Sequence, residues 1–117
     1  IRARFRPSER LQHTMTDALQ ATVRTRANVY FDGKCVSHSL ELADGSKKSV
    51  GVILPSSLRF NTGAPERMEL IEGECRVRLP GAADWATFRG GQSFDVPGNA
   101  AFDIEVSQTL HYVCHFL

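Results

Sequence analysis

The stretch RFNTGAPERMELIEG, residues 59–73, decides the fold. Phe60 and Thr62 stand one residue apart, Glu66 follows after three further residues, and Gly73 follows after six more. Glycine and proline interrupt the stretch directly after Thr62, which is typical of a turn between two short strands. The spacing is that of one wall of a metal site in which most ligands have been replaced by other residues.

A second stretch, GQSFDVPGNAAF, has a spacing that matches the first. Gly91 is followed by five residues, then by Pro97-Gly98-Asn99, then by two residues and Phe102. The two spacings together are those of the two sequence motifs of cupins, in which histidines and one glutamate bind a metal ion. The sequence therefore keeps the frame of a cupin site.

The residues at the ligand positions do not fit a metal. Phe60, Thr62 and Phe102 stand where the cupin motifs carry histidine, and only Glu66 keeps its identity. Imidazole nitrogens must converge at about 2.0–2.1 Å from the ion, and these side chains cannot supply them. We expect instead an aromatic cavity with one acid and one hydroxyl, suited to a flat, partly apolar ligand.

Short apolar runs alternate with turn signals from Val29 to the end of the chain. Turns such as FDGK, LPGAAD and VPGNA recur about every 8–12 residues, the rhythm of an all-β sandwich or barrel. We expect nine strands, at residues 35–42, 49–54, 58–62, 67–71, 75–79, 86–89, 93–96, 101–106 and 110–116. The predicted fold is all-β: a single cupin-type antiparallel β-barrel, or jelly roll, over residues 28–117.

Residues 1–27 are polar and basic, and we expect them to form an N-terminal extension. Two interpretations of this segment stay open. Apolar residues recur at every fourth position, at Leu11, Met15, Leu19 and Val23. This spacing favours a short amphipathic helix with Ser8 as its N-cap. Alternatively, residues 1–14 are upstream translated sequence or a cloning remnant without function, because Met15 resembles a natural start.

Charge and cysteine content further limit the possible partners and the cellular compartment. Lys and Arg number 14 and Asp and Glu 13, so bulk charge gives no support for binding to nucleic acid or a membrane. No apolar run approaches the roughly 18 residues of a membrane span, and no apolar core follows the basic start. The odd, widely spaced set Cys35, Cys75 and Cys114 predicts reduced thiols in a cytoplasmic protein.

Six longer sequence segments carry a family resemblance: YFDGK, SVGVI, FNTGAPERMELIEGE, VRLPGAADW, GQSFDVPGNAAFDIEV and YVCHFL. From Tyr30 to Leu117 the chain closely resembles the pyrimidine/purine nucleoside phosphorylases, a group of small metal-free cupins. The resemblance implies a homodimer of barrels that needs no metal or other cofactor. It also implies cleavage of many nucleosides by phosphate, giving α-D-ribose 1-phosphate and the free base.

This reaction assigns roles to the motif residues. Phe60, Phe94 and Phe102 could stack on a purine or a pyrimidine, because stacking recognises ring faces rather than hydrogen-bond patterns. Glu66 could accept hydrogen bonds from the ribose hydroxyls or stabilise the positive sugar carbon of the transition state. Thr62 could bind the ribose or the phosphate. We expect Glu66 and Thr62 to be catalytic and the three phenylalanines to bind substrate.

Phosphate needs a cation, and Lys47, Arg59 and Arg78 are the candidates. Arg67 ranks lower, because strand alternation puts it on the face opposite Glu66. A second function stays open, namely a non-catalytic cupin module that binds a small aromatic ligand or a partner protein. It is open because no nucleophile–base pair and no glycine-rich phosphate loop is visible. The two functions differ in whether phosphate binds beside the aromatic cavity.

Overall fold

The computed structural model describes residues 16–117. The predictions for residues 1–15, among them the Ser8 cap and the non-native residues 1–14, lie outside the described residues. The predicted N-terminal helix is wrong over its described part, since residues 16–23 contain no helix. Thr22 and Val23, both β-branched, instead form a short strand. The sheet thus begins inside the segment that the sequence suggested was an extension.

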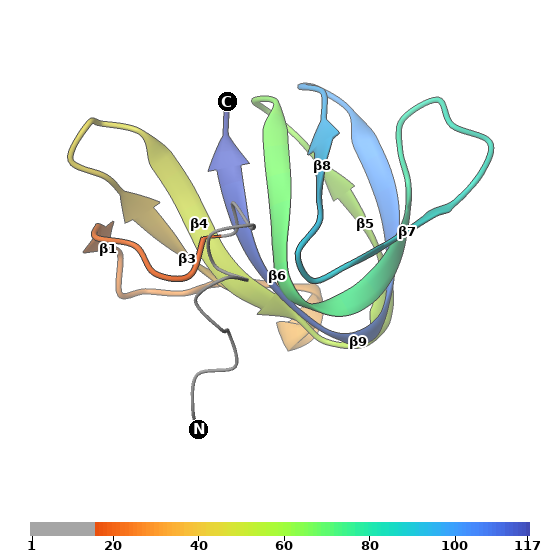
Figure 1. The fold of residues 1–117 in the computed structure, drawn as a ribbon, viewed down its shortest axis with the longest axis horizontal. Coiled ribbons are helices and arrows are strands. Elements are labelled where there is room, and N and C mark those ends of the chain that lie inside the picture. The colour runs from red at the N-terminus through yellow and green to blue at the C-terminus, as the bar shows by residue number, and fades with distance from the viewer. Residues whose placement is uncertain (1–15) are drawn as a thin grey trace, which may run out of the picture.

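The remaining chain is almost entirely antiparallel strand, as predicted, and Figure 1 shows its arrangement. The only helical element among the described residues is a 3₁₀ turn, η1, at Phe31–Gly33. The strands are β1 (Thr22–Val23), β2 (Asn28–Tyr30), β3 (Cys35–Glu41), β4 (Lys47–Ile53), β5 (Ser56–Asn61), β6 (Glu66–Arg78), β7 (Ala86–Arg89), β8 (Ser93–Val96) and β9 (Ala101–Phe116).

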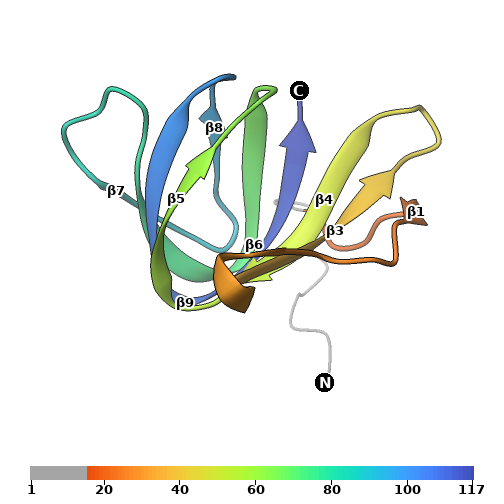
Figure 2. The same cartoon turned by 180° about the vertical axis from the view of Figure 1, so that it is seen from behind.

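The two long strands β6 and β9 organise the barrel. They pair with each other along nearly their whole length. The first half of β9 also pairs with β5 and its second half with β4, while β6 pairs first with β8 and then with β7. Both strands curve along the lower edge of the molecule in Figures 1 and 2, with the other strands rising around them. One continuous sheet therefore curls around an interior space.

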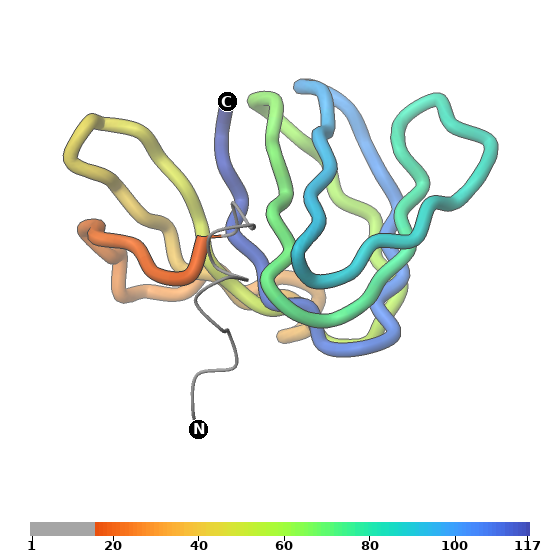
Figure 3. The backbone as a smooth tube through the Cα atoms, viewed as in Figure 1, coloured from red at the N-terminus to blue at the C-terminus, as the bar shows by residue number. Residues whose placement is uncertain are grey.

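The edge of this sheet belongs to the N-terminal strands. β3 pairs with β4 and, on its other side, with both β1 and β2. Figure 3 shows the described N-terminal segment, in red and orange, running beside the β3–β4 hairpin. No helix among residues 16–117 is long and apolar enough to cross a membrane.

Four of the predicted strands are halves of longer ones. Residues 67–71 and 75–78 lie in β6, with Leu79 just beyond its end, and residues 101–106 and 110–116 lie in β9. The sequence places turn residues between these halves, but the chain only bends there. The predicted strands at residues 86–89 and 93–96 match β7 and β8.

The bend in β6 occurs at Gly73, whose φ is +107°. A Cβ atom at this position would lie 2.2 Å from the carbonyl oxygen of Thr109 on β9, so only glycine fits. The pairing between β6 and β9 shifts register between Leu70 and Cys75. Such an irregularity bends a strand without ending it. β6 therefore pairs with β8 before the bend and with β7 after it.

Candidate functional site

A cavity of about 190 Å³ lies inside the curled sheet, and it receives side chains from β2, β3, β4, β5, β6 and β9. Its wall has an aromatic part and a polar part. The aromatic part is formed by Tyr30, Phe60, Phe102 and Phe116. The polar part contains Ser37, Ser49, Asn61, Glu66, Tyr112 and Cys114. The cavity expected from the two sequence motifs is therefore present, with additional polar groups.

Phe60 and Phe102 form the core of the aromatic wall. They are directly paired residues on β5 and β9. Their rings lie 5.7 Å apart with an angle of 21° between their planes, which is a stacked arrangement. Phe94 does not line this cavity: it is buried behind the wall, with its ring 6.0 Å from that of Phe102. The structure thus brings two of the three predicted phenylalanines into the cavity.

Glu66 opens β6 and lines the cavity from the side of the β5–β6 turn. Burial raises the pKa of the Glu66 carboxyl, and a hydrogen bond from the Cys114 thiol acts in the opposite direction. Cys114 is itself hydrogen-bonded to Ser49, its paired residue on β4. A carboxylate in this surrounding is poorly solvated, so it interacts strongly with any positive charge that forms beside it.

A second polar group lies further along the same wall. The Tyr112 hydroxyl is 3.5 Å from the Cys35 sulfur and is also hydrogen-bonded to Ser37. Burial is the main cause that raises the pKa of Tyr112. Ser37 and Tyr112 are 3% and 7% exposed, which is rare for polar side chains at the wall of a small barrel. Both residues line the cavity, so their linked hydroxyls form a polar part of its wall.

Sequence reasoning missed most of this polar wall. Ser37 follows the buried Cys35 by two residues, and Tyr112 precedes Cys114 by two, so strand alternation puts each pair on one face. This alternation could have indicated from the sequence that Ser37 and Tyr112 face the interior of the barrel. The structure includes Tyr112 in the cavity wall together with Ser37.

Thr62 does not line the cavity. Its side chain is buried, and its hydroxyl donates a hydrogen bond of 2.7 Å to the carbonyl oxygen of Pro97. The same hydroxyl accepts a hydrogen bond of 3.1 Å from the backbone N–H of Ala100. Thr62 therefore ties the β5–β6 turn to the β8–β9 turn. A catalytic role for Thr62 stays a prediction, and this geometry does not favour it.

The predicted phosphate ligands lie outside the cavity lining, in ion pairs with carboxylates. The carboxylate of Asp103 accepts hydrogen bonds of 2.9 Å from both Arg59 and Arg78, and these bonds lower the pKa of Asp103. Lys47 lies 3.8 Å from a carboxylate oxygen of Glu41. None of the three cations lines the cavity. Phosphate binding by these residues remains a prediction without support from their positions.

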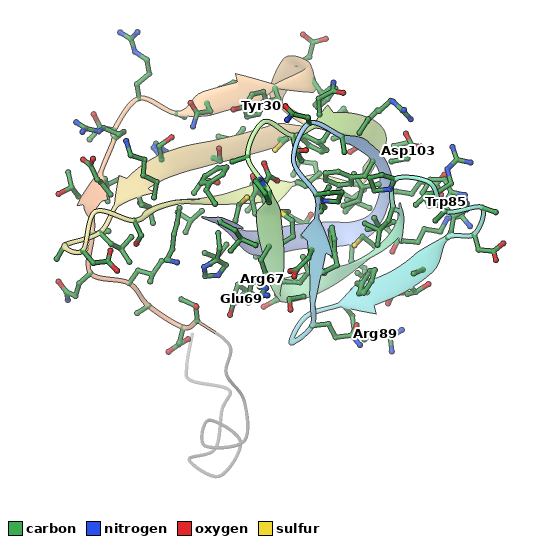
Figure 4. The ribbon with its side chains drawn as sticks, turned by 90° about the horizontal axis from the view of Figure 1, so that it is seen from above. Tyr30, Arg67, Glu69, Trp85, Arg89 and Asp103 are labelled. Carbon is green, nitrogen blue, oxygen red and sulfur yellow. The ribbon has the colours of Figure 1, made fainter. Side chains whose placement is uncertain are left out.

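Arg67, the lower-ranked cation, also lies outside and pairs with Asp95 at 2.8 Å. Figure 4 shows that Tyr30 lies on one side of the curved sheet and that Arg67 and Glu69 lie on the other. Among the described residues that line the cavity, Glu66 is the only carboxylate and there is no lysine or arginine. The electrostatics of the described wall are those of one half-buried acid among neutral groups.

The donor set in the cavity does not fit a cupin metal centre. Two stacked phenyl rings occupy positions at which the cupin motifs carry histidine, and they leave Glu66 without nitrogen partners. Over residues 16–117, no group of three or more His, Cys, Asp or Glu side chains could hold an ion. His115 is engaged on the outer face, 2.7 Å from the Lys48 ammonium and 2.8 Å from Glu69.

Comparison with known proteins gives the family. A model of the family described as pyrimidine/purine nucleoside phosphorylase matches residues 25–116. The chain belongs to this family. A pyrimidine/purine nucleoside phosphorylase from Janthinobacterium sp. (strain Marseille) is 63% identical over 98 residues, which are 84% of this chain and 94% of that protein. One from Aromatoleum aromaticum is 66% identical over 96 residues, 81% of this chain and 90% of that protein.

Solved structures agree with the family and the fold. A protein of unknown function from Acinetobacter sp. ADP1 has a TM-score of 0.81 at 52% identity, covering 83% of this chain and 94% of that one. The cupin domain of Schizosaccharomyces pombe Cnp3 has a TM-score of 0.57 at 13% identity, covering 80% of this chain and 69% of that one. The second likeness concerns the fold alone, and it confirms the predicted cupin-type barrel.

Proposed function

We propose that this chain is a metal-independent nucleoside phosphorylase of broad base specificity. It would convert a purine or pyrimidine nucleoside and phosphate into α-D-ribose 1-phosphate and the free base. The observation that carries the proposal is the cavity, in which a stacked aromatic pair and a half-buried carboxylate face the same small space. The names of the relatives support the same reaction class.

The aromatic wall suits the base. Phe60 and Phe102 present ring faces and carry no hydrogen-bonding groups, so they would bind purines and pyrimidines with little discrimination. The cavity is smaller than the roughly 300–1,000 Å³ of pockets that enclose a drug-sized ligand. A nucleoside would therefore be only partly enclosed, with one of its two parts reaching toward the opening.

The polar wall suits the ribose and its transition state. Phosphorolysis passes through a sugar with oxocarbenium character. A carboxylate beside that sugar stabilises the positive charge that develops, and it does so most strongly where water is excluded. Glu66 meets this condition in part, because it is half-buried at the cavity wall and this burial raises the pKa of its carboxyl. Ser37 and Tyr112 supply neutral hydroxyls for the sugar oxygens.

The described cavity wall contains few groups that could bind phosphate. Neutral donors such as Asn61 and Ser49 line the cavity, but no described lining residue is a cation. This observation favours a second candidate, a non-catalytic cupin module that binds a small aromatic ligand or a partner protein. The two candidates differ in one measurable property, the dependence of base release on phosphate.

We further propose a homodimer in the cytoplasm, with no nucleic-acid or membrane partner. Val23 on the edge strand β1 is 51% exposed, and an exposed apolar edge strand invites pairing. The three cysteines are free, which accords with a reducing compartment. Light scattering that gives a monomer mass across the micromolar range would contradict the dimer.

The experiment that tests the function is a base-release assay. Inosine, adenosine, guanosine, uridine, cytidine and thymidine are each incubated with the protein, with and without phosphate, and with EDTA in every tube. We expect phosphate-dependent release from several of them. Release from none would favour the binding module, and release that EDTA abolishes would overturn metal independence.

A further inference from the structure

The turn between β2 and β3 has an unusual backbone. Phe31 and Asp32 both have positive φ, at 53° and 54°, and Gly33 follows at 91°. The left-handed region is unfavourable for a non-glycine residue, and only short polar residues such as aspartate visit it readily. Phe31 is therefore the strained residue of this turn, and backbone strain of this kind concentrates at functional sites.

The hydrophobic core does not require the Phe31 ring. No residue of Phe31–Gly33 is buried, and Phe31 is 43% exposed. What the strained conformation does achieve is a contact with the cavity wall. The Phe31 ring meets the Phe60 ring edge-on, with the two centroids 5.2 Å apart and the planes at 82°. The turn is thus attached to one of the two stacked rings.

Tyr30 is the last residue of β2 and directly precedes this turn. Tyr30 pairs with Cys35, a buried residue that lines the cavity, so their side chains share one face of the strand pair. Tyr30 lines the cavity as well, yet it is 47% exposed. A residue that is both part of the wall and half open to solvent lies at the mouth of the cavity.

We propose that Tyr30 is a substrate-binding residue at this mouth, where its ring packs against the nucleobase. Phe31 is a positioning residue, because its left-handed conformation and its contact with Phe60 hold Tyr30 in place. The identity of the ligand as a nucleoside rests on the proposed function. The aromatic surface of the site then comprises Phe60, Phe102 and Tyr30, and the partly enclosed base gains a third ring at the opening.

The test is nucleoside binding without phosphate, so that no turnover is needed. Isothermal titration with uridine and with inosine compares wild type with Tyr30→Ala, Tyr30→Leu and Tyr30→Phe. A stacked base is worth about 1–3 kcal/mol on alanine substitution, so Tyr30→Ala weakens binding of both nucleosides roughly tenfold. Tyr30→Phe keeps the ring and stays within about twofold. Tyr30→Leu keeps apolar bulk without a ring and behaves like the alanine variant.

Val29→Ala is the matched control. Val29 is the neighbouring residue, is 62% exposed and does not line the cavity, so its removal leaves binding unchanged. The proposal is overturned if Tyr30→Ala and Tyr30→Leu bind like wild type, if Val29→Ala is equally impaired, or if wild type binds neither nucleoside. Binding that depends on Tyr30 without any phosphorolysis would defeat the proposed function and leave this inference standing.

Phe31→Gly tests the positioning role. Glycine adopts the left-handed conformation freely, which offsets the lost ring contact, so the unfolding midpoint stays close to wild type. Nucleoside affinity nevertheless falls several-fold, because Tyr30 is no longer held. A merely structural role would move stability and not affinity, so unchanged affinity in a folded Phe31→Gly variant overturns the positioning role.

Discussion

Phe60 and Phe102 are paired across β5 and β9 with their rings stacked 5.7 Å apart, at positions where the cupin motifs carry metal-binding histidines. A ring pair at this place turns the frame of a metal site into a surface for a flat ligand. Phe60 is the more accessible of the two, since Phe102 is only 3% exposed. Phe60 is therefore the better position at which to test base stacking.

We predict that Phe60→Leu raises the KM for inosine and uridine roughly tenfold, because a stacking contact worth about 1–3 kcal/mol is lost. The kcat falls less, since the residues near the sugar stay in place. Initial rates of base release at saturating phosphate measure both constants. Phe88→Leu is the control: Phe88 belongs to the same run of rings, 5.0 Å from Phe94, but does not line the cavity. Equal effects from both variants would contradict a direct contact by Phe60.

We predict that Glu66→Gln lowers kcat by about a hundredfold or more, as expected when a group that stabilises transition-state charge is removed. Binding of the free base changes little. Single-turnover rates and titration with hypoxanthine separate the two effects. Glu74→Gln, on the same strand but outside the cavity, keeps wild-type kcat. Wild-type turnover in Glu66→Gln would make Glu66 structural.

Glu66→Gln is expected to lower kcat but to raise the thermal stability of the protein at neutral pH. Because burial raises the pKa of Glu66 in the folded protein, the folded state binds this proton more tightly than the unfolded chain does. Ionised Glu66 therefore lowers stability at neutral pH, and Glu66→Gln unfolds at a higher temperature than wild type at pH 8. The difference shrinks as the pH falls through the raised pKa toward the ordinary glutamate value of about 4.3. Melting curves at several pH values check this, and a destabilised variant at pH 8 would contradict it.

We predict that Thr62→Val destabilises the protein by about 1–3 kcal/mol, because it leaves the Ala100 N–H and the Pro97 carbonyl without their buried partner. Urea unfolding measures the loss. The folded variant keeps its kcat within about threefold, since Thr62 does not line the cavity. Thr62→Ser retains the hydroxyl and loses less stability. A large fall in kcat without a loss of stability would restore a catalytic role for Thr62.

We predict that alanine at Lys47, Arg59 or Arg78 changes the KM for phosphate by less than about threefold. All three side chains are exposed and form ion pairs, and none of them lines the cavity in which the substrate would bind. Initial rates at varied phosphate concentration give the KM. A tenfold rise for any of them would show that phosphate binds through that residue after all.

The parts of the site that were predictable from the sequence are those within the two spaced motifs. Glu66 is a clear example: its distance from Phe60 and Gly73 in the sequence was enough to place it in the cavity, although a glutamate after a proline usually faces solvent. Strand alternation alone was likewise enough to separate Arg67 from Glu66. The predicted strands at residues 86–89 and 93–96 were correct because clear turn residues bound both of them.

The remainder depends on contacts between segments that are distant in sequence. Ser37 and Tyr112 meet only because β3 and β9 both pair with β4. Gly73 has the sequence signature of a turn, since a bend inside a long strand and a true turn have the same local composition. The motif spacing led us to expect the Thr62 hydroxyl in the cavity, but it faces the neighbouring turn, because it finds backbone partners there.

The most direct test of the central claim is to follow the fate of phosphate with inosine as substrate, by ³¹P NMR in the presence of EDTA. We predict that inorganic phosphate disappears and α-D-ribose 1-phosphate appears in equal amounts with hypoxanthine, and that Glu66→Gln abolishes most of this conversion. Release of hypoxanthine while the phosphate signal stays constant, or no release at all, would contradict the claim.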